Sequence, residues 1–383
     1  MRLSLVTLLA LVSAPTALAG SSCIAFDTAW NLLAFGFNGK DYNAGTSNTW
    51  ASGSATDITT NGRPPFNGND VKCYLAEFFN AIYIIGADTS KPADIYIYDA
   101  GAKTWSTQSV TAGDFDPTSF QAILDHDTNV FYALSKGNLF SLEMNELKAA
   151  KSGSIAWAPQ GKAEITTDNY DPVMAVAQNH VFFFGVPGTP AGSTPIFVIH
   201  FAFWQAGAQP MGGNFPDSHG QATSIFLDVG VQQEIAFIPD DGSKTYIVNV
   251  ETNTTQTMSG PATVDAKARY FASPTAIVQL ASSGAVSWIP YKAGDNSANS
   301  GAKWSAVSNL AAVAPSSGGG SAPSGSAPSQ SSKTAGSGGS AAPSGSKTAG
   351  GSGPSGSASG AIRHAGWGAG SVLGLVAVAF FLL

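Results

Sequence analysis

Residues 73–105, CYLAEFFNAIYIIGADTSKPADIYIYDAGAKTW, decide the fold of this chain. They hold two apolar stretches on either side of Asn80, then a second pair on either side of Ala100 and Gly101. β-Branched and aromatic residues dominate the stretches, and turn residues separate them, which is typical of β-hairpins. The segment therefore predicts four consecutive antiparallel strands.

The first of these hairpins recurs along the chain at intervals of 48–52 residues. Its six copies begin at Cys23, Cys73, Gln121, Val173, Ser224 and Ala276. Four strands per copy, repeated about six times, predict an all-β protein: a β-propeller of six four-stranded blades over residues 20–312. A seventh blade built from residues 51–65 and 295–312 remains open. A β-sandwich would not explain why the period persists.

The stretch from Ala81 to Trp105 resembles a kelch repeat, in which an apolar strand ends in Gly-Gly and a Tyr and a Trp follow at this spacing. The glycine pair is reduced to Gly86-Ala87 here, and to Gly36-Phe37 in the first copy. Over residues 20–310 the chain is similar to degenerate kelch-like propellers, of the kind found in fungal glycosylphosphatidylinositol (GPI)-anchored cell-surface proteins. Kelch propellers include binding proteins and galactose-oxidase-like enzymes, so the resemblance leaves the activity open.

Both ends of the chain carry targeting patterns. Residues 1–19 combine Arg2, an apolar run and small residues ending at Ala19, which predicts a cleaved signal peptide. Residues 313–356 are almost only Ser, Gly, Ala, Pro and Thr, which predicts a disordered stalk. Residues 357–383 join small residues, a spacer and a terminal apolar run, as a GPI-attachment signal does. The predicted attachment sites are Ser357, Ser359 and Gly360, and the alternative is a short tail anchor.

Composition narrows the class of protein and of partner. Only 11% of residues are charged, which argues against a helical bundle or coiled coil. Residues 20–312 hold all 25 acids and 14 of the 18 bases, a net charge of −11. Such a domain is not expected to bind nucleic acid. The patterns at the two ends predict an extracellular protein. It is expected to be secreted and then held at the plasma membrane or transferred to the cell wall.

Two covalent modifications are expected from the predicted extracellular localisation. Cys23 and Cys73 are the only cysteines, and in an oxidising compartment we expect them to form a disulfide that pins the first copy of the repeat to the second. The one N-glycosylation sequon begins at Asn253, in a hairpin turn that matches the turn at Gly101.

Five loops that lead into the predicted inner strands each place an aromatic residue beside a charged one, and such loops share one face of a propeller. An aromatic ring can stack on a sugar while a carboxylate accepts its hydroxyl protons, so we expect a sugar-binding mouth there. The alternative is that the rings plug the space between blades and the acids cap turns. The candidate ligand-binding residues are Phe66, Asp70, Phe115, Asp116, Tyr170, Asp171, Phe215, Asp217, His219, Arg269 and Tyr270.

Catalysis has weaker support than binding. The five histidines show no metal-ligand spacing, and no catalytic, metal or cofactor site is predicted. The turn motif from Asp240 to Tyr246 is a single degenerate sialidase-like Asp-box. We therefore expect a monomeric binding or adhesion module for a glycan or a protein at the cell surface or wall. The alternatives are a secreted carbohydrate-active enzyme, either galactose-oxidase-like or a glycoside hydrolase, and a structural wall protein.

Overall fold

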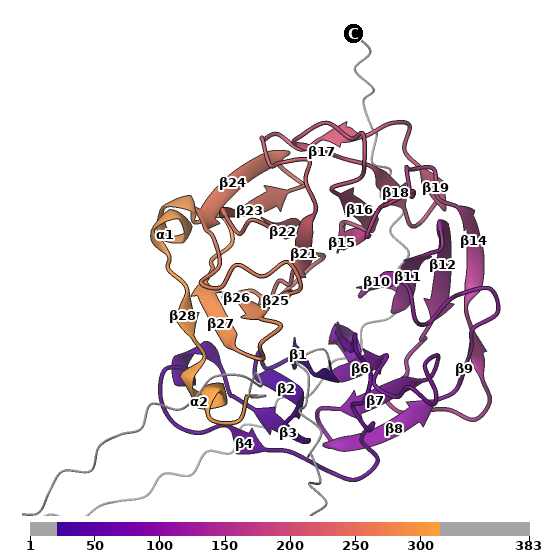
Figure 1. Ribbon diagram of the computed structural model, residues 1–383, viewed down its shortest axis with the longest axis vertical. Helices are drawn as coiled ribbons and strands as arrows, with labels where there is room; N and C mark the ends of the chain where they lie inside the picture. The colour runs from indigo at the N-terminus through magenta and orange to yellow at the C-terminus, as the bar shows by residue number, and fades with distance from the viewer. Residues whose placement is uncertain (1–20, 315–383) are drawn as a thin grey trace, which may run out of the picture. The chain divides into compact units, whose positions relative to one another are not determined.

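The computed structural model describes residues 21–314, whose strands form a ring of sheets in a β-propeller-like arrangement (Figure 1). The predicted signal peptide, the stalk beyond residue 314 and the GPI signal with Ser357, Ser359 and Gly360 lie outside the described residues. Within residues 21–314 no helix is long and apolar enough to cross a membrane.

Four separate antiparallel sheets of four strands make up the first part of the ring. The first sheet holds β1 (Cys23–Phe26), β2 (Leu32–Phe37), β3 (Lys40–Asn43) and β4 (Thr56–Asp57). The second holds β5 (Lys72–Ala76), β6 (Ala81–Ile85), β7 (Ile95–Asp99) and β8 (Thr104–Gln108). The third holds β10 (Gln121–Asp125), β11 (Val130–Ser135), β12 (Asn138–Glu143) and β14 (Ala158–Lys162). The fourth holds β15 (Val173–Ala177), β16 (His180–Phe184), β18 (Ile196–Val198) and β19 (Phe203–Trp204).

An eight-stranded sheet completes the ring. Its first half holds β21 (Gly220–Ile225), β22 (Glu234–Pro239), β23 (Lys244–Asn249) and β24 (Thr254–Ser259). Its second half holds β25 (Arg269–Ser273), β26 (Ala276–Leu280), β27 (Val286–Pro290) and β28 (Ser305–Ala306). Each half is antiparallel, and the halves are joined by the parallel pairing of Ile225 with Ala272.

Short elements connect the sheets or lie beside them. β9 (Val110–Thr111) pairs in parallel with β13 (Ile155–Ala156), and β17 (Ser193–Thr194) pairs with β20 (Gln209–Pro210). The helical elements are η2 (Ser47–Thr49), η3 (Glu77–Phe79), α1 (Asn296–Gly301) and α2 (Ser308–Ala311).

The innermost strands β1, β5, β10, β15, β21 and β25 contact one another in chain order, and β25 contacts β1, which closes the ring. Each sheet is covered by a neighbour on both faces, so its central strands are buried on both sides. This explains the continuous apolar runs: all five residues of β6, Ala81–Ile85, are buried, as are all six of β2.

The sixth copy of the repeat differs from the sequence prediction. Its innermost strand is Arg269–Ser273, which was expected to be a loop, and Ala276–Leu280 is the second strand rather than the first. Pro274 and Thr275 form the two-residue connection between them, since Ser273 pairs with Ala276. The fifth innermost strand likewise starts at Gly220, earlier than the predicted Ser224.

Residues 51–65 and 295–312 were considered for a seventh blade, and the structure places their strands elsewhere. β4 pairs with β3 as the outer strand of the first sheet, and β28 pairs with β27 as the outer strand of the last. The end of the described chain also packs on its beginning, because the Asn309 side chain donates to the Ala44 carbonyl at 2.7 Å. The residues around Asn309 therefore help to close the ring.

Two glycines at the ends of second strands have a structural explanation. Gly36 and Gly86, each at or just after the end of a second strand, both have positive φ, +79° and +77°. A Cβ at these positions would lie 2.7 Å from the Ser21 carbonyl oxygen and 2.8 Å from that of Asp70. Positive φ and this close backbone approach explain why glycine occupies both positions.

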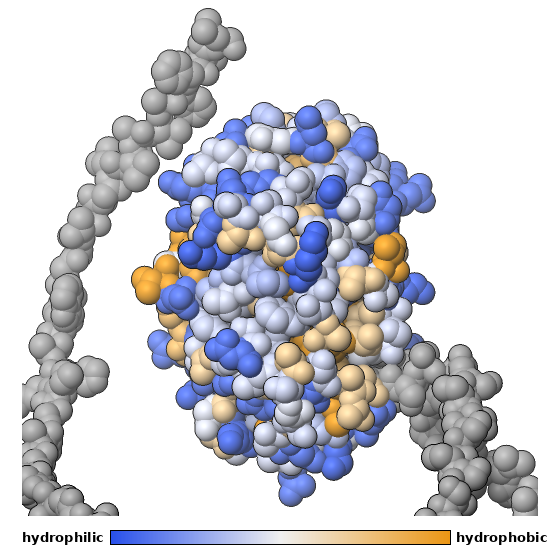
Figure 2. Space-filling view, turned by 90° about the vertical axis from the view of Figure 1, so that its left-hand side faces the viewer, coloured by the Kyte–Doolittle hydropathy of each residue, from blue (hydrophilic) through white to orange (hydrophobic). Residues whose placement is uncertain are grey.

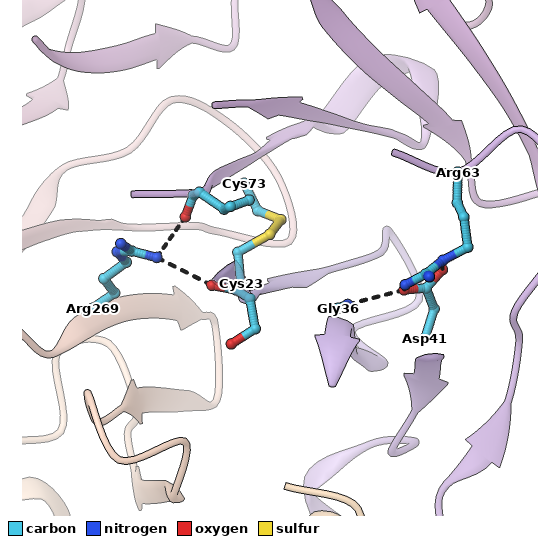
Figure 3. The surroundings of a disulfide bond; sticks show 8 residues. Cys23, Gly36, Asp41, Arg63, Cys73 and Arg269 are labelled. Atoms are coloured by element: carbon cyan, nitrogen blue, oxygen red, sulfur yellow. Dashed lines mark hydrogen bonds and ion pairs between the residues drawn. A yellow bond between two sulfur atoms is a disulfide. The ribbon is translucent and has the colours of Figure 1, made fainter. Parts of the chain in front are cut away.

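The predicted disulfide between Cys23 and Cys73 is confirmed. It joins the innermost strands β1 and β5, whose cysteine Cα atoms are 5.8 Å apart (Figure 3). The sequon residue Asn253 is exposed in the β23–β24 turn with φ +49°, in the conformation that Lys103 adopts in the β7–β8 turn. N-glycosylation of Asn253 stays a prediction.

Candidate functional site

Three of the five predicted aromatic residues are buried in the core. Phe66, Phe115 and Phe215 are 7%, 3% and 1% exposed, so none of them presents a ring face to solvent. Phe115 stacks on Trp157 with ring centroids 4.0 Å apart, and Phe215 packs 5.7 Å from Phe237. Their position matches the alternative prediction, in which these rings fill the space between neighbouring sheets.

The two tyrosines are half-buried and hydrogen-bonded. The Tyr170 hydroxyl donates to the Phe184 carbonyl at 2.9 Å and accepts from the Val173 amide at 3.0 Å. The Tyr270 hydroxyl accepts from the Gln279 side chain at 3.0 Å, and burial raises the pKa of both phenols. These contacts support the ends of the innermost strands.

Two of the predicted acids, Asp116 and Asp217, lie apart from the other charged candidates. Asp116 caps its own turn by accepting from the Thr118 amide, and it pairs with Lys136 at 2.9 Å. The hydrogen bond from the Thr118 hydroxyl, followed by the one from Lys136, lowers the pKa of Asp116 to about 2. Asp217 is exposed in the loop before β21. Asp116 therefore acts as a turn residue.

The remaining predicted residues gather where the innermost strands begin, which we call the start face. Arg269, the first residue of β25, donates to the Val71 and Ser22 carbonyls and to Asp70 Oδ1 at 2.7 Å. Figure 3 shows this guanidinium beside the disulfide. β25 belongs to the last sheet and Asp70 precedes the second, so these residues can meet only near the axis of the ring.

Lys72 joins this group and was missed by the sequence prediction. It is the first residue of β5, it forms an ion pair with Asp70, and its Nζ lies 5.0 Å above the Phe120 ring. Burial lowers the pKa of Lys72, and the charge of Asp70 opposes that shift. A sequence signal was present, since Lys72 occupies the strand-start position that Arg269 occupies in the last copy.

A histidine and two acids complete the charged group. His219 Nδ1 lies 2.7 Å from Asp240 Oδ2, and its Nε2 lies 3.8 Å from Asp171 Oδ2. Asp171 lies just before the innermost strand β15 and Lys72 begins the innermost strand β5, so both subgroups belong to the start face. Asp240 is the first residue of the turn motif that ends at Tyr246. It reaches His219 because β22 ends beside the start of its antiparallel partner β21. We call Asp70, Lys72, Asp171, His219, Asp240 and Arg269 the start-face cluster.

The chemistry of the start-face cluster is that of polar recognition. Three carboxylates, an imidazole and two cations come together from the second sheet, the fourth sheet and the two halves of the eight-stranded sheet. Asp171 is 87% exposed on its side chain and His219 is 30% exposed, so both are available to a ligand. Arg269 and Lys72 are engaged in holding the strands and Asp70 together.

Aromatic side chains occupy the opposite end of the axis, which we call the end face. Phe226, just after β21, stacks on Phe271 of β25 at 5.9 Å and lies 6.0 Å from Trp30 and 6.2 Å from His126. Trp30 and His126 follow innermost strands of the first and third sheets, which are not neighbours of β21 in the ring. Phe226 therefore packs close to the axis.

Glu77 lies among acids on the end face, which leads to a prediction about pH. Burial, followed by repulsion from Asp127 and Asp228, raises the pKa of Glu77 to about 7. An unfolded chain releases this proton at about pH 4.3, so the folded state loses stability as the pH rises from about 4.3 to about 7. Glu77→Gln removes that loss.

We expect Glu77→Gln to be more stable than wild type by about 1 kcal/mol at pH 8, a value reduced for the partial exposure of the side chain. At pH 4.5 the two proteins should unfold at nearly the same urea concentration. Urea titrations at both pH values measure this, and an equal difference at the two pH values would contradict the assignment.

No known protein family matches this sequence, and no curated protein does. Among solved structures, the chain is similar to PorZ, an essential bacterial surface component of the type-IX secretion system of Porphyromonas gingivalis. The two share 13% identity with a TM-score of 0.42, over 74% of this chain and 32% of that one. The chain thus matches about a third of the length of PorZ.

Proposed function

We propose that this protein is a six-bladed, kelch-like propeller. The eight-stranded sheet then counts as two blades, because each half is a complete antiparallel four-stranded sheet and only Ile225 and Ala272 join them. The closed order of six innermost strands, together with the glycines at positions 36 and 86, supports this count and this kinship.

The proposed setting is the outer surface of the cell. The pattern at residues 1–19 supports export, and the pattern at residues 357–383 supports transfer to a GPI lipid. The disulfide agrees with an oxidising compartment. Figure 2 shows one side of the molecule, on which hydrophilic residues predominate and hydrophobic ones form small patches. Such a surface fits a monomer on a stalk.

The proposed activity is the binding of a glycan or protein ligand, and the start-face cluster is the observation that carries it. Its charged groups converge from four parts of the ring, and Asp171 and His219 are open to solvent. A ligand would be held by hydrogen bonds to these polar groups rather than by stacking on Phe66, Phe115 or Phe215. Because both cysteine sulfurs are in the disulfide, neither is free for the Tyr cross-link of a galactose-oxidase-like enzyme.

Replacement of Asp171 by asparagine tests this site. We expect Asp171→Asn to weaken binding to cell-wall polysaccharide or to a purified surface ligand by about tenfold, the value of one charge-assisted hydrogen bond. The thermal midpoint should stay that of wild type, because the carboxylate is exposed and its one ion-pair contact, with His219, is 3.8 Å long.

Asp168→Asn is the matched control, because Asp168 is an exposed acid in the same loop. It should bind as wild type does. Equal binding by Asp171→Asn and wild type would contradict the proposed role of the start-face cluster.

A further inference from the structure

Two adjoining hollows lie on the end face, beside the turns of the second, third and fourth sheets. The first, of about 590 Å³, is lined by Phe78, Phe79, Asn129, Glu146 and other residues from the second and third sheets. The second, of about 350 Å³, is lined by Tyr132, Glu143 and His200, among others. Both include Thr128 and Asn145, so they meet there. We call the pair the end-face groove.

Phe78 provides an aromatic platform at the first hollow. Its side chain is 66% exposed, which is unusual for so large an apolar group, and one face of the ring stacks on His126 with centroids 6.0 Å apart. Burial lowers the pKa of His126, against the charges of Asp127 and Asp125. The other face of Phe78 is left for a ligand. Since the ring already rests on its neighbour, binding costs little ordering of the side chain.

The charged groups around the groove favour a ligand that brings hydroxyl or amine donors. Asp127 and Glu146 line the first hollow and Glu143 lines the second, against the single cation Lys151. Burial, followed by repulsion from Asp127 and Asp228, raises the pKa of nearby Glu77. Acceptors therefore outnumber cations, which suits a donor-rich ligand and opposes an anionic one.

We propose that the end-face groove binds an uncharged or amine-bearing oligosaccharide, with one pyranose ring stacked on Phe78 and its hydroxyls donating to the carboxylates of Asp127 and Glu146. The apolar C–H face of the sugar would cover the phenyl ring, while its hydroxyl edge meets the carboxylates. The second hollow would take the next sugar, across Thr128 and Asn145. This proposal rests on the proposed binding function and assigns it a second site, on the face opposite the start-face cluster.

Calorimetric titration of the processed full-length protein tests the groove. The probes are tetrasaccharides of glucose, N-acetylglucosamine, glucosamine and galacturonate, each with its monosaccharide. We expect at least one uncharged or amine-bearing tetrasaccharide to bind, at least tenfold more tightly than its monosaccharide, and the galacturonate tetramer not to bind. Phe78→Ala should weaken that binding at least tenfold, and Glu146→Gln should weaken it three- to tenfold.

Phe201→Ala is the matched control, because Phe201 is 77% exposed in the β18–β19 turn and lines neither hollow. It should bind as wild type does. Absence of binding by wild type, or equal binding by wild type and Phe78→Ala, would overturn the proposal. Loss of binding in Asp171→Asn with retention in Phe78→Ala would also overturn it, while leaving the start-face cluster as the binding site.

Discussion

Removal of the disulfide should lower the free energy of unfolding by about 4 kcal/mol in the double variant Cys23→Ala, Cys73→Ala. The cross-link closes a loop of 50 residues, and a chain-entropy model assigns a loop of that length about 4 kcal/mol through restriction of the unfolded chain. The bond also ties β1 to β5, next to the contact of β25 with β1 that closes the ring.

Equilibrium unfolding in urea measures this loss. Wild-type protein with its disulfide reduced is the control, because it lacks the cross-link but keeps both sulfur atoms in the core. Reduced wild type and the double variant should unfold at similar urea concentrations, well below oxidised wild type. A double variant within 1 kcal/mol of oxidised wild type would show that the ring closes without this bond.

Asp41→Ala is expected to have a comparably large effect. The Asp41 side chain is fully buried and accepts from Arg63 Nε at 2.8 Å and Nη2 at 2.7 Å, and from the Gly36 amide at 3.0 Å (Figure 3). Its removal leaves the largely buried guanidinium and the Gly36 N–H without their partner. Breaking one side of such a pair costs about 3–5 kcal/mol.

The exposed ion pair between Lys40 and Asp57 supplies the matched control, since it bridges the neighbouring strands β3 and β4 at the surface. Asp57→Ala should leave the thermal midpoint close to that of wild type, because surface pairs contribute little. Thermal unfolding of both variants measures the contrast. Equal midpoints for Asp41→Ala and wild type would refute the role given to the buried pair.

Much of the fold could be predicted from the period of the sequence. A hairpin recurring every 48–52 residues indicates stacked copies of one unit, and the cysteines at equivalent positions of the first two copies indicate the cross-link. The sixth copy was displaced by one strand, since Arg269–Ser273 looks like the preceding loops. Only pairing with Ala276–Leu280 shows that these residues are a strand.

The candidate site was only partly predictable, for a physical reason. Phe66, Phe115 and Phe215 recur with the repeat, and residues that recur in this way pack each copy against the next. The contacts of the start-face cluster do not recur, because Arg269 meets Asp70 across 199 residues and His219 meets Asp240 across a hairpin. The contact of Arg269 with Asp70 depends on ring closure, which the local pattern does not encode.

The most direct test of the central claim, that this propeller is a ligand-binding module of the cell surface, is a glycan array probed with the processed full-length protein. The account predicts selective binding to a group of related glycans and tenfold weaker binding by Asp171→Asn or Phe78→Ala. Uniform absence of binding, with both variants indistinguishable from wild type, would contradict the glycan-binding account and leave a protein ligand or a structural wall role.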